Sequence, residues 1–358
     1  MEAVTIRLEN ISKTFIHRLK GEVSAVDQVT LHVQPGEFLT LLGPSGCGKT
    51  TTLRMIAGFE RPDRGRIYIG EEDVTDLMAN QRNIGFVFQN YALFPHLSVF
   101  ENVAYGLKVK EASKIEIEKS VGDVLALVGL KGYDRQFPHQ LSGGEQQRVA
   151  LARAVVIHPR VLLFDEPLSN LDAKLRVYMR GEIRQLQKAL SITTVYVTHD
   201  QEEAMAISDH IAVMNEGKII QIGTAEELYL RPESPFVAQF IGKINLLPAE
   251  VKEVTEEKVI LRIFKQNFQV SKGSHHFEPG QRVNVFVRPE TIELVKAIDE
   301  DSLKASVVER SFLGEKLDGH SIYATSYDPL RHGTFSLHQE VGVRFNPNAI
   351  TILKEVER

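Results

Sequence analysis

The clearest chemical pattern in the chain is the run Gly43, Pro44, Ser45, Gly46, Cys47, Gly48, Lys49 and Thr50. It fits the spacing G-x-x-x-x-G-K-[ST], in which glycines let successive backbone N–H groups curl around phosphate oxygens. A helix that begins at Lys49 adds the positive end of its dipole. Lys49 is placed to reach the outer phosphates, and the hydroxyl of Thr50 to bind magnesium. We therefore predict that residues 43–50 and the adjacent Thr51 bind a phosphate chain with Mg²⁺.

Two adjacent carboxylates follow an apolar run at residues 161–164. Neighbouring residues of an extended strand point to opposite sides, so Asp165 and Glu166 should have different tasks. Asp165 suits the Mg²⁺ shell, whereas Glu166 can polarise an attacking water as a general base. Either residue alone would also fit an acidic strand end that faces solvent. Beside a phosphate loop, the pair instead favours hydrolysis of the bound phosphate chain.

A second anion-binding helix start is predicted at Ser142, Gly143 and Gly144. These residues open a helix that runs to about residue 157, and they present free N–H groups at the positive end of its dipole. Taken alone the signal is weak, because most Ser-Gly pairs are simple helix caps.

An α/β domain is predicted to position these residues. Residues 38–42 form a buried strand, followed by the phosphate loop and a helix at residues 49–57 that ends at Gly58. Further short apolar or β-branched runs alternate with helical stretches, at residues 84–88, 161–164 and 193–197. This order is typical of a largely parallel sheet, with ligands at the carboxyl ends of its strands.

The rest of the chain predicts a helical insertion and a second domain. Apolar residues recur at helical spacing within residues 98–157, so we expect a helical subdomain at about residues 90–160 of a first domain at residues 1–240. After residue 240, apolar and polar residues alternate, for example at residues 283–288 and 341–345. We predict a small all-β domain at residues 241–358, barrel-like or sandwich-like.

Composition narrows the class of protein. The chain has 358 residues, 43% hydrophobic and 25% charged, which fits two globular domains. A net charge of −5 argues against broad nucleic-acid binding, and the single cysteine, Cys47, excludes a disulfide scaffold. No apolar run approaches the ~18 residues needed to span a bilayer, and the N-terminus lacks the pattern of a signal peptide.

Taken in order, the motifs resemble those of the ATP-binding-cassette (ABC) ATPases over residues 1–240. The series is residues 43–50, Gln89, residues 141–144, Asp165 with Glu166, residues 169–172 and His199. Glu145 departs from the family, where glutamine is more usual. The resemblance implies ATP and Mg²⁺ as ligands and a homodimer in which Ser142, Gly143 and Gly144 cover the ATP bound to the partner.

Further roles follow only from this resemblance. It implies that Phe15 stacks on adenine, although a lone phenylalanine is often a core residue. Gln89 would sense Mg²⁺ and the attacking water, Asp172 would bridge the dimer, and His199 would contact the γ-phosphate. Glu166, His199 and Gln89 thus form the implied catalytic set, and Thr50, Gln89 and Asp165 the implied Mg²⁺ set.

The C-terminal domain resembles the small β-barrel appended to importer ATPases of the maltose, polyamine, sulfate and ferric-iron groups. That implies transmembrane permease subunits, contacted by the aromatic segment 90–96, an extracytoplasmic solute-binding protein, and a peripheral place on the cytoplasmic face of the inner membrane. The barrel would support the dimer or bind a regulatory ligand.

Different segments of the chain resemble importer ATPases for different solutes. Residues 194–200 and 213–215 resemble the ferric-iron and phosphonate groups, and residues 240–245 the polyamine group. We favour ferric iron, with polyamine or phosphonate as alternatives.

Two other classes are less consistent with the sequence. A soluble ABC protein of DNA repair or translation would have tandem cassettes or a long heptad insertion, and a basic stripe if it bound nucleic acid. A small-molecule kinase would not need the Ser142 signature.

Overall fold

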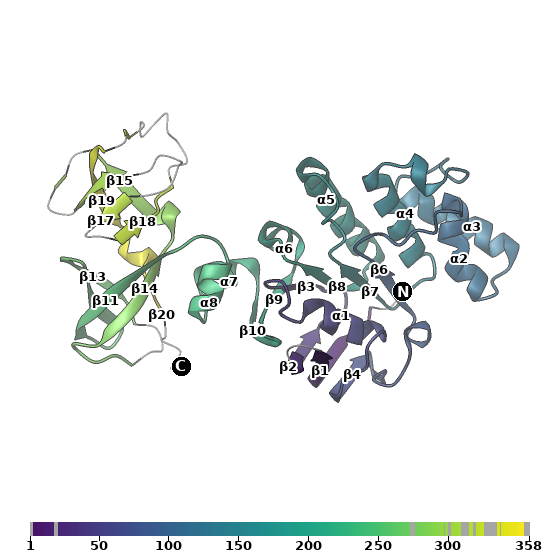
Figure 1. Cartoon of the computed structure of the whole chain (residues 1–358), viewed down its shortest axis with the longest axis horizontal. Helices are drawn as coiled ribbons and strands as arrows, with labels where there is room; N and C mark the ends of the chain where they lie inside the picture. The colour runs from purple at the N-terminus through teal and green to yellow at the C-terminus, as the bar shows by residue number, and fades with distance from the viewer. Residues whose placement is uncertain are drawn as a thin grey trace. The chain divides into compact units, whose positions relative to one another are not determined.

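The computed structural model describes residues 3–17, 21–272, 276–296, 298–299, 302–308, 315–317, 320–325, 335–336 and 338–353. Internal contacts divide the chain into two compact units, Met1–Ala225 and Glu226–Arg358 (Figure 1). Both outer ends of the predicted domains, Met1 and Arg358, lie outside the described residues.

The buried apolar runs of the first unit form a six-stranded sheet in the order β10-β9-β3-β8-β7-β6. All neighbours pair in parallel except the edge strand β10, which runs antiparallel to β9. The strands are β3 (Phe38–Leu42), β6 (Ile84–Val87), β7 (Val161–Asp165), β8 (Thr193–Thr198), β9 (His210–Asn215) and β10 (Lys218–Gly223). The largely parallel sheet that the sequence predicted is therefore confirmed.

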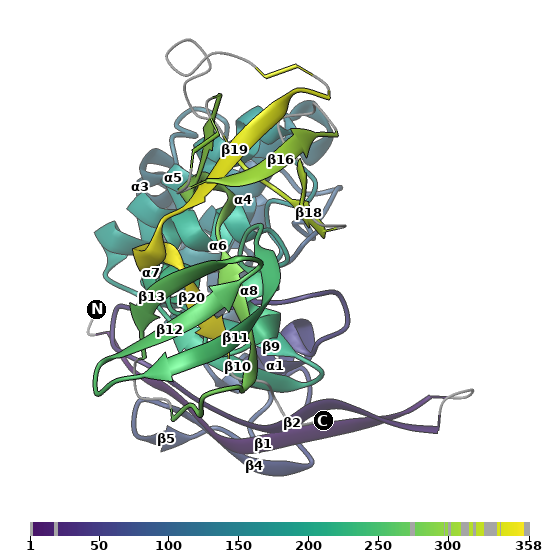
Figure 2. The ribbon, with the colours of Figure 1, turned by 90° about the vertical axis from the view of Figure 1, so that its left-hand side faces the viewer.

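A second sheet of this unit has four antiparallel strands in the order β2-β1-β4-β5. Its strands are β1 (Ile6–His17), β2 (Gly21–Val33), β4 (Arg64–Ile69) and β5 (Glu72–Asp73). Figure 2 shows β1 and β2 as a long ribbon. We did not predict this sheet. Register shifts after Leu8 and Ile11 interrupt the two-residue alternation along β1, although Val29, Leu31 and Val33 alternate at the end of β2.

Helices cover the six-stranded sheet and form the predicted insertion. They are α1 (Lys49–Ala57), α2 (Val99–Val109), α3 (Lys114–Leu127), α4 (Gly143–Val155), α5 (Ala173–Leu190) and α6 (Gln201–Ile207), with 3₁₀ turns η1 (Ala79–Gln81) and η2 (Pro138–Gln140). α2, α3 and α4 make up the helical insertion. α1 begins and ends where the sequence predicted, and Gly58 closes it in a left-handed conformation.

Alternate side chains of each central strand face two different cores. On β7, Val161 and Leu163 join a core that includes α1 and the four-stranded sheet. Leu162 and Phe164 join a core that includes α2, α3, α4 and α5. α1 accordingly lies between the two sheets (Figure 1). A strand buried on both faces leaves only its ends free for polar chemistry, and ligands of open α/β sheets bind at the carboxyl ends.

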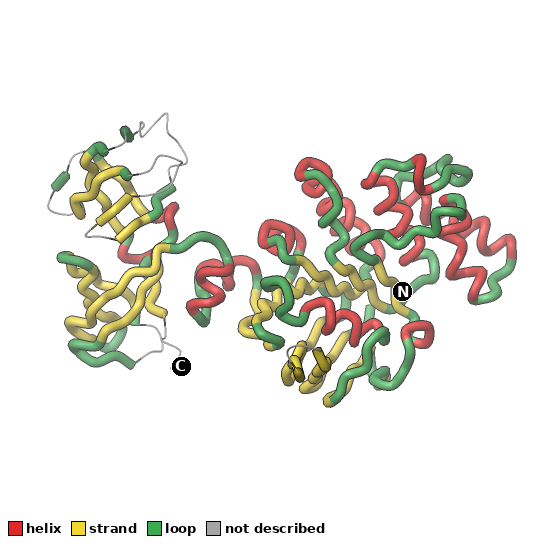
Figure 3. Tube along the Cα trace, in the orientation of Figure 1, coloured by secondary structure: helices red, strands yellow, loops and turns green. Residues whose placement is uncertain are grey.

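The second unit is β-rich, as predicted (Figure 3). One five-stranded sheet has the order β13-β12-β11-β14-β20 and the other β15-β19-β16-β17-β18. The strands are β11 (Asn245–Val254), β12 (Lys258–Ile263), β13 (Gln266–Ser271), β14 (Arg282–Val287), β15 (Ile292–Val295), β16 (Leu303–Val307), β17 (Glu315–Leu317), β18 (His320–Ile322), β19 (Glu340–Phe345) and β20 (Thr351–Leu353). The short helices are α7 (Ala225–Leu230), α8 (Pro235–Phe240), η3 (Pro289–Thr291) and η4 (Pro347–Ala349). Side chains of both sheets share one core.

Within the described residues, no helix combines the length and the apolar character that crossing a membrane requires.

Candidate nucleotide-binding and hydrolysis site

The phosphate loop joins β3 to α1 and is shaped by close backbone contacts. A Cβ atom on Gly43 would lie 2.3 Å from the carbonyl oxygen of Met214, and one on Gly48 would lie 2.3 Å from that of Ala25. Gly48 also has φ 104° and gives α1 no side-chain cap. Glycine is therefore required at both positions, and the first N–H groups of α1 are left without a capping side chain.

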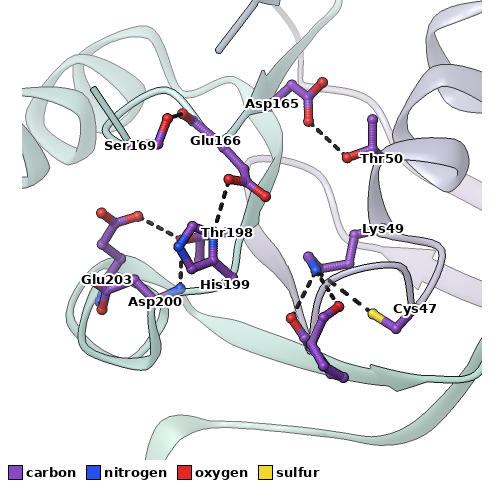
Figure 4. Close-up of polar contacts among 12 residues, drawn as sticks. Cys47, Lys49, Thr50, Asp165, Glu166, Ser169, Thr198, His199, Asp200 and Glu203 are labelled. Carbon is purple, nitrogen blue, oxygen red and sulfur yellow. Dashed lines mark hydrogen bonds and ion pairs between the residues drawn. The ribbon is translucent and has the colours of Figure 1, made fainter. Parts of the chain in front are cut away.

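Lys49 lies beneath this loop with its ammonium group turned back to it. Its Nζ donates hydrogen bonds to the carbonyl oxygens of Gly43, at 2.8 Å, and Pro44, at 2.9 Å (Figure 4). Ser45 and Gly46, at the tip of the loop, are exposed. A buried ammonium beneath the exposed tip of a glycine-rich loop favours an anion in the loop.

Cys47 is buried at a variable position of the loop, and burial raises the pKa of its thiol. A thiol that stays protonated is a weak nucleophile, so Cys47 fills space here.

Thr50 and Asp165 bring two oxygen ligands together from different elements. The Thr50 hydroxyl, in the first turn of α1, donates to Oδ1 of Asp165, at the end of β7, over 3.2 Å. Burial raises the pKa of Asp165, so its charge lies in a poorly solvated place. The described residues contain no cluster of three or more His, Cys, Asp or Glu suited to a metal. Two such ligands fit Mg²⁺, which takes few protein ligands and completes its shell with water and phosphate.

Glu166 points away from Asp165, towards His199 (Figure 4). Its backbone has φ 43°, a left-handed conformation that non-glycine residues rarely adopt, and its N–H donates to the carbonyl oxygen of Val197. Oε2 of Glu166 lies 3.0 Å from Nδ1 of His199. The predicted divergence of the two carboxylates is thus present, and a backbone turn as well as strand alternation produces it.

The other implied nucleotide contacts lie on nearby loops and strands. Gln89 is exposed just beyond β6, and its carbonyl oxygen accepts a hydrogen bond from the Asn170 side chain. Phe15, on β1, is 39% exposed, and Nζ of Lys13 lies 5.5 Å from the centre of its ring. A ring this accessible is not a core residue, and the Lys13 ammonium lies over it.

The Ser142 signature packs against the loop and helix that follow Glu166 within the same chain. Ser142 is the N-cap of α4, and its N–H donates a hydrogen bond to Oε2 of Glu145 at 2.8 Å. A Cβ atom on Gly143 or Gly144 would lie 3.1 Å from side chains of Leu171 and Leu175, respectively. Asp172 caps α5 by accepting from the Leu175 N–H. The structure therefore gathers Lys49, Thr50, Asp165, Glu166 and His199 at one edge, and places the signature beside residues 171–175.

Arg153 is a residue of this region that the sequence did not single out. From α4 it donates hydrogen bonds of 2.7 Å to the carbonyl oxygens of Tyr91 and Ala92, which have φ values of 60° and 49°. An arginine followed by apolar residues looks like any helix surface in sequence, so only the folded chain reveals this contact.

Comparisons with known proteins identify the family of this chain. The model of the ABC transporter family matches residues 26–169. The spermidine/putrescine import ATP-binding protein of Marinobacter nauticus is 47% identical over 319 residues, covering 89% of this chain and 84% of that protein. The Fe(3+) ions import ATP-binding protein of Rhizobium etli is 46% identical over 328 residues, covering 90% and 88%.

Among solved structures, a dimeric bacterial ABC transporter cassette matches with a TM-score of 0.55 and 33% identity, covering 61% of this chain and 98% of that one. A dimeric post-hydrolysis state with ADP and Pi bound matches with a TM-score of 0.54, 31% identity and the same coverage. With the motifs and the geometry described above, these matches show that the chain belongs to the ABC transporter family, as one of its ATP-binding ATPase proteins.

Proposed function

We propose that this chain is the ATP-hydrolysing subunit of an importer. The observation that carries the proposal is the meeting of the phosphate loop, the Thr50–Asp165 pair and the Glu166–His199 pair at the carboxyl ends of β3, β7 and β8. Such an edge is where ligands of parallel α/β sheets bind.

In the proposed reaction, Lys49 and the N–H groups of the loop hold the phosphates, and Phe15 stacks on adenine. Thr50 and Asp165 would hold Mg²⁺, which neutralises phosphate charge when bound. Glu166 takes a proton from a water molecule. The oxygen of that water attacks the γ-phosphorus, and the bond from the γ-phosphorus to the oxygen of ADP breaks. His199 would contact the γ-phosphate, and its Nδ1, 3.0 Å from Oε2 of Glu166, would also hold that carboxylate in place. Gln89 would sense Mg²⁺ and the attacking water.

The proposed assembly is a homodimer of cassettes on a permease. The structural neighbours named above are dimeric. Ser142, Gly143 and Gly144 would cover the partner's ATP, and Asp172 would lie at the dimer contact. The segment 90–96 would contact the transmembrane subunits at the cytoplasmic face of the membrane, with an extracytoplasmic solute-binding protein on the opposite side.

Two cargoes have support among the relatives. Proteins named for Fe(3+) import and for spermidine/putrescine import are similarly close, at 46% and 47% identity. We propose ferric iron, with polyamine as the alternative. Uptake of radiolabelled ferric citrate and spermidine, in cells with and without the gene, distinguishes the two.

Two substitutions test ATP hydrolysis itself. Lys49→Ala removes the cation under the loop and should weaken ATP binding. Glu166→Gln should keep binding but lower kcat by about 10²-fold, the usual scale for loss of a general base. The Glu166→Gln protein should also accumulate as an ATP-dependent dimer in size-exclusion chromatography. If this variant hydrolyses ATP at the parental rate, Glu166 is not the base. If it stays monomeric at saturating ATP, Ser142, Gly143 and Gly144 do not cover the ATP of the partner.

A further inference from the structure

A buried carboxylate lies directly behind the turn that carries His199. Glu203, in the first turn of α6, is only 3% exposed. Its Oε2 accepts a hydrogen bond from the Thr198 hydroxyl at 2.8 Å (Figure 4). The same oxygen accepts a second hydrogen bond from the Tyr196 hydroxyl at 3.1 Å. Burying a carboxylate has a large desolvation cost that two hydroxyl donors offset only in part.

The same position in two other helices has an ordinary capping role. Glu101 in α2 and Glu145 in α4 are also the third residue after the N-cap, and each accepts a hydrogen bond from the N-cap N–H. This reciprocal arrangement is a capping box, and it leaves the glutamate at the surface. In α6 the N-cap residue is Asp200, whose N–H instead donates to the Thr198 hydroxyl at 3.0 Å. Capping therefore does not explain why Glu203 is turned inward.

Because Glu203 points inward, Thr198, Asp200 and Glu203 form a closed set of hydrogen bonds around the turn that carries His199. Glu203 holds the Thr198 hydroxyl, which accepts from the Asp200 N–H, and Asp200 Oδ1 accepts from the Glu203 N–H at 3.1 Å. These bonds fix the residues on either side of His199 in the chain. Tyr196 binds the same carboxylate oxygen but has no such link to the turn.

The other groups around the turn come from α5 and from the catalytic pair. Arg176 and Arg180 each lie 3.5 Å from Oδ2 of Asp200. Glu203 also lines a cavity of about 40 Å³ whose walls include Glu166 and His199. The buried carboxylate is thus next to the two residues proposed for hydrolysis, although neither bonds to it directly.

We propose that Glu203 is a positioning residue for ATP hydrolysis, acting through Thr198 on the turn that carries His199 and so on the carboxylate of Glu166. This inference rests on the proposed roles of Glu166 and His199. The required property is a hydrogen-bond acceptor at the position of Oε2, so a glutamine, whose carbonyl oxygen can accept both bonds, should serve nearly as well as glutamate.

The first test compares Glu203→Ala with Glu203→Gln in the full chain. Glu203→Ala should lower kcat roughly 10-fold to 100-fold, the scale of a small misplacement of catalytic groups, while the dissociation constant for ATP changes less than about 2-fold. Glu203→Gln should restore kcat to within about 3-fold of the parent. Parental kcat for Glu203→Ala, or equal losses in both variants, overturns the proposal. Glu166→Gln, assayed in parallel, reports separately on the proposed hydrolysis.

A second test compares two matched variants, Thr198→Val and Tyr196→Phe. It shows whether Glu203 acts through Thr198 even if Glu203→Ala does not fold. Thr198→Val and Tyr196→Phe each remove one hydroxyl donor to the same oxygen, but only Thr198 is linked to the turn. Thr198→Val should lower kcat about 10-fold and Tyr196→Phe less than about 2-fold. In a His199→Ala background the effect of Thr198→Val should disappear, because it acts through His199. Equal effects of the pair, or additive losses with His199→Ala, overturn the proposal.

Discussion

The glycines of the phosphate loop show how single residues decide whether a binding site can form. Gly46 and Gly48 both have positive φ values, of 80° and 104°. A Cβ atom at position 46 would meet nothing within 4 Å, whereas one at position 48 would lie 2.3 Å from a backbone oxygen of Ala25. Sequence alone treats the two as equal members of one motif. The structure separates a conformational requirement at Gly46 from a steric one at Gly48.

This difference predicts unequal effects of alanine at the two positions. Gly48→Ala must push the loop away from β2, and we expect it to weaken ATP binding by at least roughly 10-fold. Gly46→Ala should cost only the left-handed conformation, about 1–2 kcal/mol of stability, with a smaller loss of affinity. Titration with a fluorescent ATP analogue and urea unfolding measure both quantities. Equal affinities for the two variants would contradict the steric account.

Glu203 also predicts a pH dependence of stability. Burial raises its pKa, opposed by hydrogen bonds from Thr198 and Tyr196 and by the charge of Arg180, while Asp200 adds to the increase. Because the folded pKa lies above the unfolded one, folding favours the protonated form. Its contribution to stability is full below the unfolded pKa, near 4.3, and is lost as pH rises through the folded pKa.

Glu203→Gln removes this titration without changing the shape of the side chain. The free energy of unfolding of the parent, relative to Glu203→Gln, should therefore fall as pH rises from about 4 towards neutrality. Urea unfolding of both proteins across this range is the measurement. A difference between the two proteins that does not change with pH would contradict the raised pKa. So would a parent that gains stability relative to Glu203→Gln as pH rises.

Helix α4 connects the signature to the segment proposed to meet the permease. Ser142 lies at its start, and Arg153 in its last turn donates to the carbonyl oxygens of Tyr91 and Ala92. Tyr91 and Ala92 have positive φ values, a strained backbone conformation that costs roughly 1–3 kcal/mol for each residue. Such residues persist only where the surrounding structure holds them. The two hydrogen bonds from Arg153 hold the carbonyl groups of these residues, so we expect movement of α4 to change the conformation of this segment.

Arg153→Ala should therefore loosen residues 90–96. We expect faster hydrogen exchange of their backbone amides, because the bonds that hold the strained residues are lost. Arg160→Ala, which loses a pair with Glu72 elsewhere in the unit, is the control. Unchanged exchange in Arg153→Ala, or an equal increase in the control, would show that Arg153 does not hold the segment.

A strand, helix or site residue could be predicted where its own stretch of sequence shows a recognisable pattern. β3, β7 and β8 are short runs buried on both faces, and α1 has a motif at its start and a glycine at its end, so their positions followed from local pattern. β1 was missed because shifts of register disrupt its alternation, whereas the alternating Val29, Leu31 and Val33 of β2 were a usable local pattern that we did not interpret as a strand. Glu203 was missed because its role depends on hydroxyls that only the fold brings to it. The left-handed turn at Glu166 likewise has no local marker.

The chain has two compact units, and the helices α7 and α8 lie in sequence where one ends and the other begins. The contacts of one arginine, Arg288, indicate to which unit these helices belong. Arg288, the residue after β14 and the N-cap of η3, is 3% exposed. Burial lowers its pKa to about 10, so it stays cationic at neutral pH. Its guanidinium donates to the carbonyl oxygens of Tyr229, Ala238, Ile241 and Lys243. It also lies 4.0 Å from the centre of the Tyr229 ring. The segment that contains α7 and α8 is thus held by the β-rich unit.

The sequence prediction ends the cassette at residue 240, and that boundary can be tested against the one that the contacts draw after Ala225. A chain ending at residue 240 keeps α7 and α8 but loses Arg288 and Phe286, against which Ala238 packs. Its helix carbonyls and buried apolar side chains would become exposed.

We therefore expect residues 1–225 to yield a monodisperse protein that binds ATP like the full chain, and residues 1–240 to aggregate or be cut by protease within 226–240. In the full chain, Arg288→Ala leaves several carbonyls without a donor and should destabilise the second unit by roughly 3 kcal/mol. Affinity for ATP should not change, because every nucleotide residue precedes position 225, and Arg288→Lys should recover part of the stability. If 1–240 is the better-behaved fragment, α7 and α8 belong with the cassette, and the boundary lies where the sequence first placed it.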